Sequence, residues 1–252
     1  MNKIDRIIEA LHNNACNLDT ELHEHNYADI IIPDLRHDCS DFEWSYDAGV
    51  SKFVILIRGE DLVIKIPFYH HFYEDDYYSD LSYWDNLDDE EQRDMTEPLE
   101  ENYIYEFQSA SNDVLEKDLG VTFGASHDYC QLECAVYEAA CLAGIEQYFA
   151  KTEWYAEVGG RDIYLQQRVN PLETEKHTDW CDSETSEKCK SLGVRCFNPT
   201  WIKDFFDIYG EDEFQKLDAF LKRYHINDLH SGNLGYRDGL PIILDYSDYN
   251  EW

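Results

Sequence analysis

Regularly spaced apolar residues predict helices near both ends and in the middle of the chain. At the N-terminus, four aliphatic residues fall on one helical face: Ile4, Ile7, Ile8 and Leu11. Residues 129–149 predict a second helix, in which Gly144 is a stop signal. Residues 201–209 and 211–224 are two further expected helices. Strands are expected in the segments before and after the second helix.

Alternating apolar and polar positions, rich in β-branched residues, predict these strands. The expected strands are residues 42–46, 53–58, 62–67, 149–158 and 162–169. Gly59 lies in the turn after the second strand, and Gly159-Gly160 lies between the last two, so both places favour a hairpin. The pattern predicts an α+β protein with a five-stranded antiparallel sheet, one main helix beside it and a mostly helical C-terminal part.

The length of the chain allows two structural parts. At 252 residues it lies near the size at which a single core stops growing, so one or two modest domains are expected. We divide it into residues 1–169, which hold the sheet, and residues 170–252. Residues 74–101 contain thirteen acidic residues and form an expected insertion, either a docking surface or a solvated loop. A second polar tract, residues 174–191, is expected to be a loop.

The chain is strongly acidic, with 54 acidic and 20 basic residues and a formal net charge of −34. This balance argues against direct binding to nucleic-acid phosphates or anionic membranes, because both need Lys and Arg. It favours a heavily solvated surface or association with a basic protein. No apolar run approaches the roughly 18 residues of a membrane span, and the N-terminus has no apolar signal core, so a cytoplasmic protein is expected.

The eight cysteines are expected to be reduced thiols, because the chain is long and has no export signal. Four potential zinc ligands lie in one region: His177, Cys181, Cys189 and Cys196. Their spacing lacks the C-x₂-C pair that makes zinc motifs specific, so buried or loop cysteines are the preferred interpretation over a zinc site.

Candidate chemistry is concentrated near the C-terminus, where residues 224–246 read Y-H-I-N-D-L-H-S-G-N-L-G-Y-R-D-G-L-P-I-I-L-D-Y. Asp228 could accept a proton from an attacking hydroxyl group. Asn233 and Asp245 could hold Mg²⁺ on a nucleoside triphosphate, since oxygen ligands suit that ion. His230 could orient the loop by hydrogen bonding. The spacing predicts that these side chains converge on one point.

A second candidate lies in the strand L-V-I-K-I-P, where Lys65 would point inward from an apolar strand and need anionic partners. Glu133 and Glu138 in the central helix are the candidates for that partner. Their five-residue separation puts them on different helical faces, so at most one can pair with Lys65.

The C-terminal segment resembles the catalytic and metal-binding segments of the protein kinase and aminoglycoside/choline kinase superfamily, whose pattern is H-x-D-x-x-x-x-N followed by hydrophobic residues and an aspartate. The D-L-H-x-G-N form is more similar to the small-molecule kinases than to the eukaryotic protein kinases. The order of strands, lysine, helix, hairpin and catalytic loop also resembles that superfamily over roughly residues 40 to 250. The resemblance implies a two-lobed protein kinase-like fold with a reduced C-terminal lobe.

The resemblance also implies a role for each residue. Lys65 would contact the α- and β-phosphates of ATP, and Glu133 is chosen as its partner because E-x-x-x-Y resembles the corresponding helix of bacterial and phage kinase-like proteins. Gly49 and Ser51 belong to the loop that would cover the nucleotide. The Q-Q-R-V-N-P segment, residues 166–171, would be the hinge that binds the adenine ring through its backbone.

The expected function is Mg-ATP-dependent phosphotransfer in which Asp228, Lys65 and Asn233 are the catalytic residues and Asn233 and Asp245 bind the metal. A basic protein is the first choice of acceptor and a small hydroxyl compound the second, and nucleotidyl transfer remains open. Such a protein would suit a phage or mobile-element effector. The alternative is a catalytically weak or inactive kinase-like binding module whose acidic surface blocks a nucleic-acid-binding protein.

Overall fold

The computed structural model describes residues 2–14, 24–48, 52–67, 114–121, 129–172 and 183–246. Its labelled helices and strands, in chain order, are α1 (Lys3–Asn13), α2 (Glu24–Asp38), β1 (Trp44–Ala48), β2 (Lys52–Ile57), β3 (Leu62–Pro67), α5 (Tyr129–Ala143), η3 (Glu146–Tyr148), β4 (Thr152–Val158), β5 (Arg161–Gln167), β6 (Asn170–Pro171), α6 (Ser183–Leu192), α7 (Pro199–Tyr209), α8 (Glu211–Arg223), η5 (Ser231–Asn233), β7 (Leu234–Arg237) and β8 (Leu240–Ile243). Residues 114–119 are helical as well.

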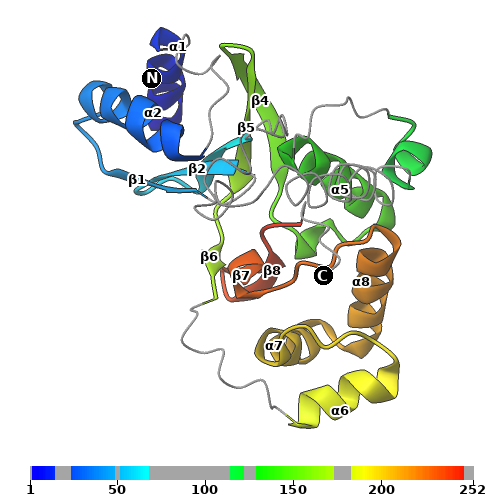
Figure 1. Cartoon of the computed structure of the whole chain (residues 1–252). Helices are drawn as coiled ribbons and strands as arrows, with labels where there is room; N and C mark the ends of the chain where they lie inside the picture. Colours follow the sequence, from blue (N-terminus) through cyan, green and yellow to red (C-terminus); the bar gives the residue numbers. More distant parts are fainter. Residues whose placement is uncertain are drawn as a thin grey trace, which may run out of the picture.

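The α+β class and the five-stranded antiparallel sheet are confirmed. The strand order is β1-β2-β3-β5-β4, so β3 pairs with β5 rather than with the next strand in sequence. The segment that contains α5 lies between these two paired strands in sequence, and α5 lies beside the sheet (Figure 1). All five expected strands are present, with ends that differ by up to three residues from the expected ones.

The two faces of this sheet carry different residues, because side chains alternate along each strand. One face is apolar and packs against α1 and α2; it includes Phe53, Ile55, Ile57, Ile64, Ile66, Ile163 and Leu165 from the sheet and Ile7, Leu11, Ile32 and Leu35 from the helices. The registers Val54↔Lys65 and Thr152↔Gln166 place Lys65, Thr152 and Gln166 on the opposite face, with Lys52 two residues before Val54. Lys52, Lys65, Thr152 and Gln166, which are all buried, therefore lie on the face turned away from α1 and α2.

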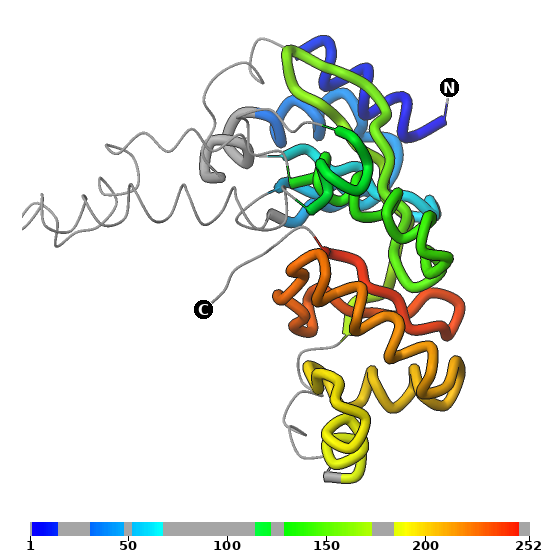
Figure 2. Tube along the Cα trace, turned by 90° about the vertical axis from the view of Figure 1, so that its right-hand side faces the viewer, coloured from blue at the N-terminus to red at the C-terminus, as the bar shows by residue number. Residues whose placement is uncertain are grey.

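The C-terminal part contains a small three-stranded sheet, β6-β7-β8, and helices α6 to α8. Figure 2 shows α1, α2 and the large sheet at one end of the molecule and α6 to α8 at the other. A second apolar cluster includes residues of these helices and of α5, among them Val136 and Ala140 of α5 and Trp201, Phe205 and Leu221. This cluster contains residues from both sides of position 169.

Two helices differ from the sequence expectation. The prediction of a loop over residues 174–191 was wrong for its second half, because α6 begins at Ser183 and buries Thr185 and Cys189, which lie one helical turn apart. Helix α2 was not predicted, and it contains Pro33, a residue that sequence reasoning treats as a helix breaker. The central helix ends at Ala143, as the stop signal at Gly144 predicts, with Gly144 at φ +69°.

Residues 74–101 and the loop residues Gly49 and Ser51 lie outside the described residues. Among the helices that are described, none has the length and apolar character that crossing a bilayer requires.

Candidate active site

The polar face of the sheet carries a buried cluster of charged residues. Lys65 of β3 donates from Nζ to both carboxylate oxygens of Glu133 in α5, at 2.8 and 2.9 Å. Lys52, the first residue of β2, donates to the same Glu133 Oε1 at 2.6 Å. The structure therefore pairs Lys65 with Glu133, while Glu138 is exposed on another face of α5.

Glu133 is completely buried, with a relative exposure of 0%, and its carboxylate is well supplied with donors. Besides the lysines, Thr152 Oγ1 lies 3.1 Å and Gln166 Nε2 3.2 Å from its Oε2. A buried carboxylate is costly unless it is paired and hydrogen-bonded, and Glu133 meets both conditions. The helix and four strands of the sheet, β2, β3, β4 and β5, are therefore held together at one charged point.

Asp245 joins this cluster from the C-terminal segment. Lys52 Nζ donates to Asp245 Oδ1 at 2.8 Å, and the Asp245 side chain is 25% exposed. The neighbouring backbone is fixed to the sheet as well, because Gln166 Nε2 donates to the Leu244 carbonyl at 2.8 Å and Tyr246 Oη donates to the Ala150 carbonyl at 2.7 Å. The aspartate at the end of the chain and the sheet thus form one polar network.

The opposite charges in this network stabilise one another's ionised forms. Burial by itself disfavours the ammonium of Lys52, but Asp245 and Glu133 outweigh it and raise the pKa of Lys52 well above its ordinary value. Burial also disfavours the carboxylate of Asp245, yet Lys52 and Lys65 hold the pKa of Asp245 well below its usual range. Asp245 is therefore ionised at neutral pH and can act as an oxygen ligand.

The loop before β7 holds the second group of candidate residues. Asn233 Nδ2 donates to the carbonyl of Asp228 at 2.8 Å and to its Oδ2 at 3.0 Å. His230 Nδ1 accepts from Gly232 N at 2.9 Å, and its Nε2 lies 3.5 Å from Asp228 Oδ2. Because Nδ1 is an acceptor, the proton of a neutral His230 is on Nε2, facing Asp228. The role expected for His230, orientation of the loop, agrees with these contacts.

The β7–β8 hairpin brings the two groups together. Leu234 pairs with Ile243 in its register, and the Asn233 carbonyl accepts from Leu244 N at 2.9 Å. Asn233 and Asp245 consequently lie at the same end of the hairpin, one at the start of β7 and the other just after β8. Asn233 therefore lies close to Asp228 on one side and to the backbone of Asp245 on the other.

The donor set is compatible with Mg²⁺. The amide nitrogen of Asn233 is bonded to Asp228, so its other amide atom, Oδ1, is the one suited to a cation. Within the described ranges there is no group of three or more His, Cys, Asp or Glu residues that could hold a metal by itself. Mg²⁺ commonly binds through one or two carboxylates, waters and substrate phosphates, so a site built from Asp245, Asn233 and a bound triphosphate would suit it.

The zinc interpretation gains nothing from the part of the chain that can be described. Cys189 is buried and Cys196 is exposed, and both are free thiols. His177 and Cys181 lie outside the described residues.

Lys52 is the functional candidate that sequence reasoning missed. It stands at the edge of the expected glycine-containing loop, residues 47–52, and the pattern there indicates no partner. The strand K-F-V-I-L-I is apolar on both faces after Lys52, so its sequence carries no alternation that marks the face; the register Val54↔Lys65 puts Lys52 on the same face as Lys65.

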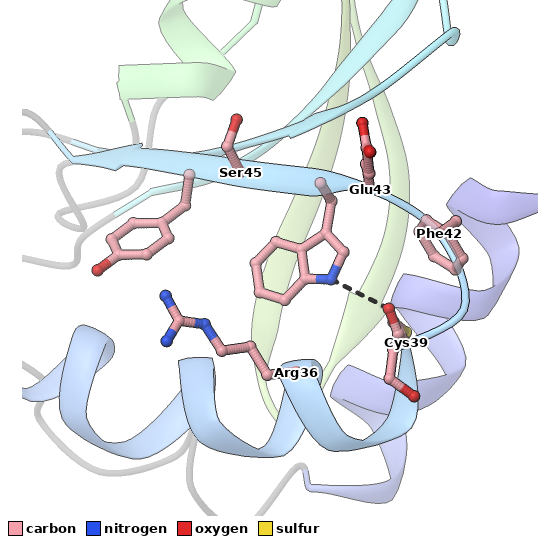
Figure 3. Close-up of a pocket in the computed structure, with 8 residues that line it drawn as sticks. Arg36, Cys39, Phe42, Glu43 and Ser45 are labelled. Carbon is pink, nitrogen blue, oxygen red and sulfur yellow. Dashed lines mark hydrogen bonds between the residues drawn. The ribbon is translucent and has the colours of Figure 1, made fainter.

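A separate cavity of about 450 Å³ lies between the end of α2 and β1 (Figure 3). Its lining includes Arg36, Cys39 and Trp44, and the dashed line in the figure is the hydrogen bond from Trp44 Nε1 to the Cys39 carbonyl, 3.2 Å long. None of the charged cluster lines this cavity.

Comparisons with protein-family models, curated protein sequences and solved structures gave no significant match. Functional assignment therefore depends on the geometry of the site and on its chemistry.

Proposed function

We propose that the chain is a two-lobed, protein kinase-like phosphotransferase that uses Mg-ATP. The observation that carries this proposal is the lysine of β3 held by both carboxylate oxygens of a buried helix glutamate, Lys65 to Glu133, with Lys52 joining the same glutamate to Asp245. A fixed ammonium beside an ionised aspartate is an arrangement suited to the phosphates of a nucleotide and their metal ion.

Each residue of the site has a distinct role in this proposal. Lys65, oriented by Glu133, binds the α- and β-phosphates, and the backbone between β5 and β6 binds the adenine ring. Asn233 and Asp245 would hold Mg²⁺, which would supply positive charge beside the phosphates. Gly49 and Ser51 remain candidates for the loop that covers them.

Asp228 has the position of a general base in the proposed reaction. Its carboxylate, fixed by Asn233, accepts the proton of the acceptor hydroxyl as that oxygen forms a bond to the γ-phosphorus. The bond between the γ-phosphorus and the bridging oxygen breaks, and ADP leaves with its electron pair. The side chain of Asp228 is 30% exposed, so an acceptor can reach it.

The net charge of −34 supports a basic protein as the acceptor, since opposite charge accelerates association. The same charge repels a free nucleotide at long range, so local cations are essential to the site. Lys52 and Lys65 supply two of them.

The proposal is tested by incubating the protein with γ-labelled or α-labelled ATP and a basic protein mixture such as histones. Label transferred from the γ-position alone is expected, and Asp228→Asn should decrease the rate by about 100-fold to 10,000-fold while the protein stays folded. Transfer of the α-label would indicate nucleotidyl transfer instead. If neither label is transferred and calorimetry detects no ATP binding with Mg²⁺, the phosphotransferase proposal is wrong.

A second candidate function is supported by one specific contact. Lys52 donates to Asp245 Oδ1, one of the two carboxylate oxygens that a metal ion could use, and such an arrangement also suits an inactive kinase-like module that acts by binding. In that case the acidic surface would block a basic, nucleic-acid-binding protein. An effect on the partner that persists in Asp228→Asn would favour blocking over catalysis.

A further inference from the structure

Lys52 differs from Lys65 in the charged groups it joins. Both ammonium groups contact Glu133 Oε1, but Lys52 also contacts Asp245 Oδ1 at 2.8 Å. The Lys52 side chain is only 4% exposed, so this contact is largely removed from water. Lys52 is therefore a cation already bound to the aspartate that the proposed function assigns to the metal.

Among the described residues, the ion pairs of the cluster join equal numbers of positive and negative side chains. Two ammonium groups, from Lys52 and Lys65, face two carboxylates, from Glu133 and Asp245. A divalent cation placed on Asp245 with Lys52 unmoved would be repelled by both lysines, and this repulsion is strong where water is excluded. A triphosphate has the opposite effect, because its oxygens attract the ammonium groups.

From this geometry we infer that Lys52 is a resident counterion that competes with the metal for Asp245 and is transferred to the phosphates when nucleotide binds. The inference rests on the proposed function, since it assigns the metal to Asp245. Nucleotide binding would draw Lys52 away from Oδ1 and expose that oxygen to the metal. Nucleotide and metal then bind with positive coupling, and Lys52 is the residue that links them.

Mn²⁺ without nucleotide is the direct probe of this exchange, measured by the electron paramagnetic resonance signal of the free ion. Lys52→Met should bind Mn²⁺ about tenfold or more tightly than the wild-type protein, because the competitor is gone. The acidic surface will bind Mn²⁺ too, so Asp245→Asn and the double variant Lys52→Met/Asp245→Asn provide the background. The added affinity must disappear in the double variant.

A second experiment repeats the Mn²⁺ titration in the presence of a non-hydrolysable ATP analogue. In the wild-type protein the analogue should tighten Mn²⁺ binding by about tenfold or more, and in Lys52→Met this coupling should largely vanish. Circular dichroism checks folding, and Lys52→Gln, which keeps an amide donor but no charge, replaces Lys52→Met if the methionine variant does not fold. Mutating Lys188, which is outside the site, should leave Mn²⁺ binding unchanged.

The outcomes separate this inference from the proposed function. Equal Mn²⁺ affinities in the wild-type and Lys52 variants would overturn the inference even if ATP binds normally. A gain in affinity that survives in the double variant would overturn it as well, because the ion would then bind elsewhere. If the gain depends on Asp245 but the analogue does not bind the wild-type protein, the competition stands, whereas the transfer to phosphates and the proposed function both fail.

Discussion

The two faces of the five-stranded sheet carry opposite chemistry although they share the same strands. Ile64 and Lys65 are neighbours in β3, yet Ile64 enters the apolar layer under α1 and α2, while Lys65 enters the charged cluster beside α5. The apolar face gains stability from each buried side chain, at about 1.5–3 kcal/mol for an isoleucine. The charged face gains little, because desolvation offsets most of the attraction between buried ions. Well-packed apolar residues would serve stability equally well there, so stability alone does not account for the buried charges.

The comparison is tested most strongly at Glu133, which holds the charged face together. Glu133→Ala leaves the ammonium of Lys65 without the carboxylate that balances it, and breaking a buried pair in this way costs about 3–5 kcal/mol. The free energy of unfolding from urea denaturation measures this loss. Glu138→Ala is the matched control on the same helix and should change stability by no more than about 0.5 kcal/mol. Similar effects of the two substitutions would contradict the importance of the buried contact.

The neighbours Ile64 and Lys65 separate stability from binding. Ile64→Ala should lower the free energy of unfolding by about 2–5 kcal/mol and leave the nucleotide affinity of the folded protein unchanged. Lys65→Met should lower stability less, by about 1–3 kcal/mol, since Glu133 keeps its contact with Lys52. It should also reduce phosphoryl transfer by about 100-fold or more. Calorimetric titration of ATP into both variants measures their nucleotide affinity. A loss of affinity in Ile64→Ala alone would mean that nucleotide binding depends on the apolar face and not on the charged face.

The sequence was most informative where one strand or helix carries the whole signal. Lysine in an apolar strand needs an anionic partner, and Glu133 and Glu138 of the central helix lie on different faces, so at most one could pair with Lys65. Glu133 was chosen between them because E-x-x-x-Y resembles the corresponding helix of kinase-like proteins, and the structure has this pairing. The close approach of Asn233 and Asp245 was foreseeable from chain length, because the strands between them are short.

Lys52 could not be assigned in the same way, because its partners depend on tertiary packing. They lie 81 and 193 residues away in sequence, in a helix and after a different sheet. Helix α6 was missed for a related reason: its sequence is polar, and its burial depends on Thr185 and Cys189, whose contact surface belongs to the rest of the C-terminal core. Local patterns do not encode which distant surface will cover a residue.

A smaller effect on stability is expected where the β7–β8 hairpin lies against β6. A Cβ atom on Gly235 of β7 would lie 2.2 Å from the carbonyl oxygen of Asn170, and neither backbone can move freely. Gly235→Ala should destabilise the protein by about 1–3 kcal/mol through overpacking and shift Asp245, which the same hairpin positions.

Gly232→Ala is the matched control for this substitution, because the atoms it meets belong to the His230 ring, which can rotate. The thermal unfolding midpoint of Gly235→Ala should be well below that of Gly232→Ala. The reverse ranking would mean that the hairpin is not tightly held against β6, and that the charged face is positioned by the sheet alone.

The smallest expected effect is on the pH dependence of stability, which directly distinguishes the charged face from the apolar face. The pKa of Asp245 is held well below its usual range in the folded state. Below about pH 5 the carboxylate of Asp245 is therefore protonated in the unfolded state while it stays ionised in the folded state. The stability contributed by Asp245 is complete above that pH and is lost as the pH falls through its lowered pKa, by at most about 1.4 kcal/mol per pH unit. Urea denaturation at several pH values should show a shallower acid slope in Asp245→Asn than in the wild-type protein. The apolar-face variant Ile64→Ala should keep the wild-type slope at lower overall stability, because it removes volume and no charge. Parallel acid slopes in the wild-type and Asp245→Asn proteins would mean that Asp245 is solvated like an ordinary surface carboxylate, and the distinction between the faces would then depend on Glu133 and the lysines.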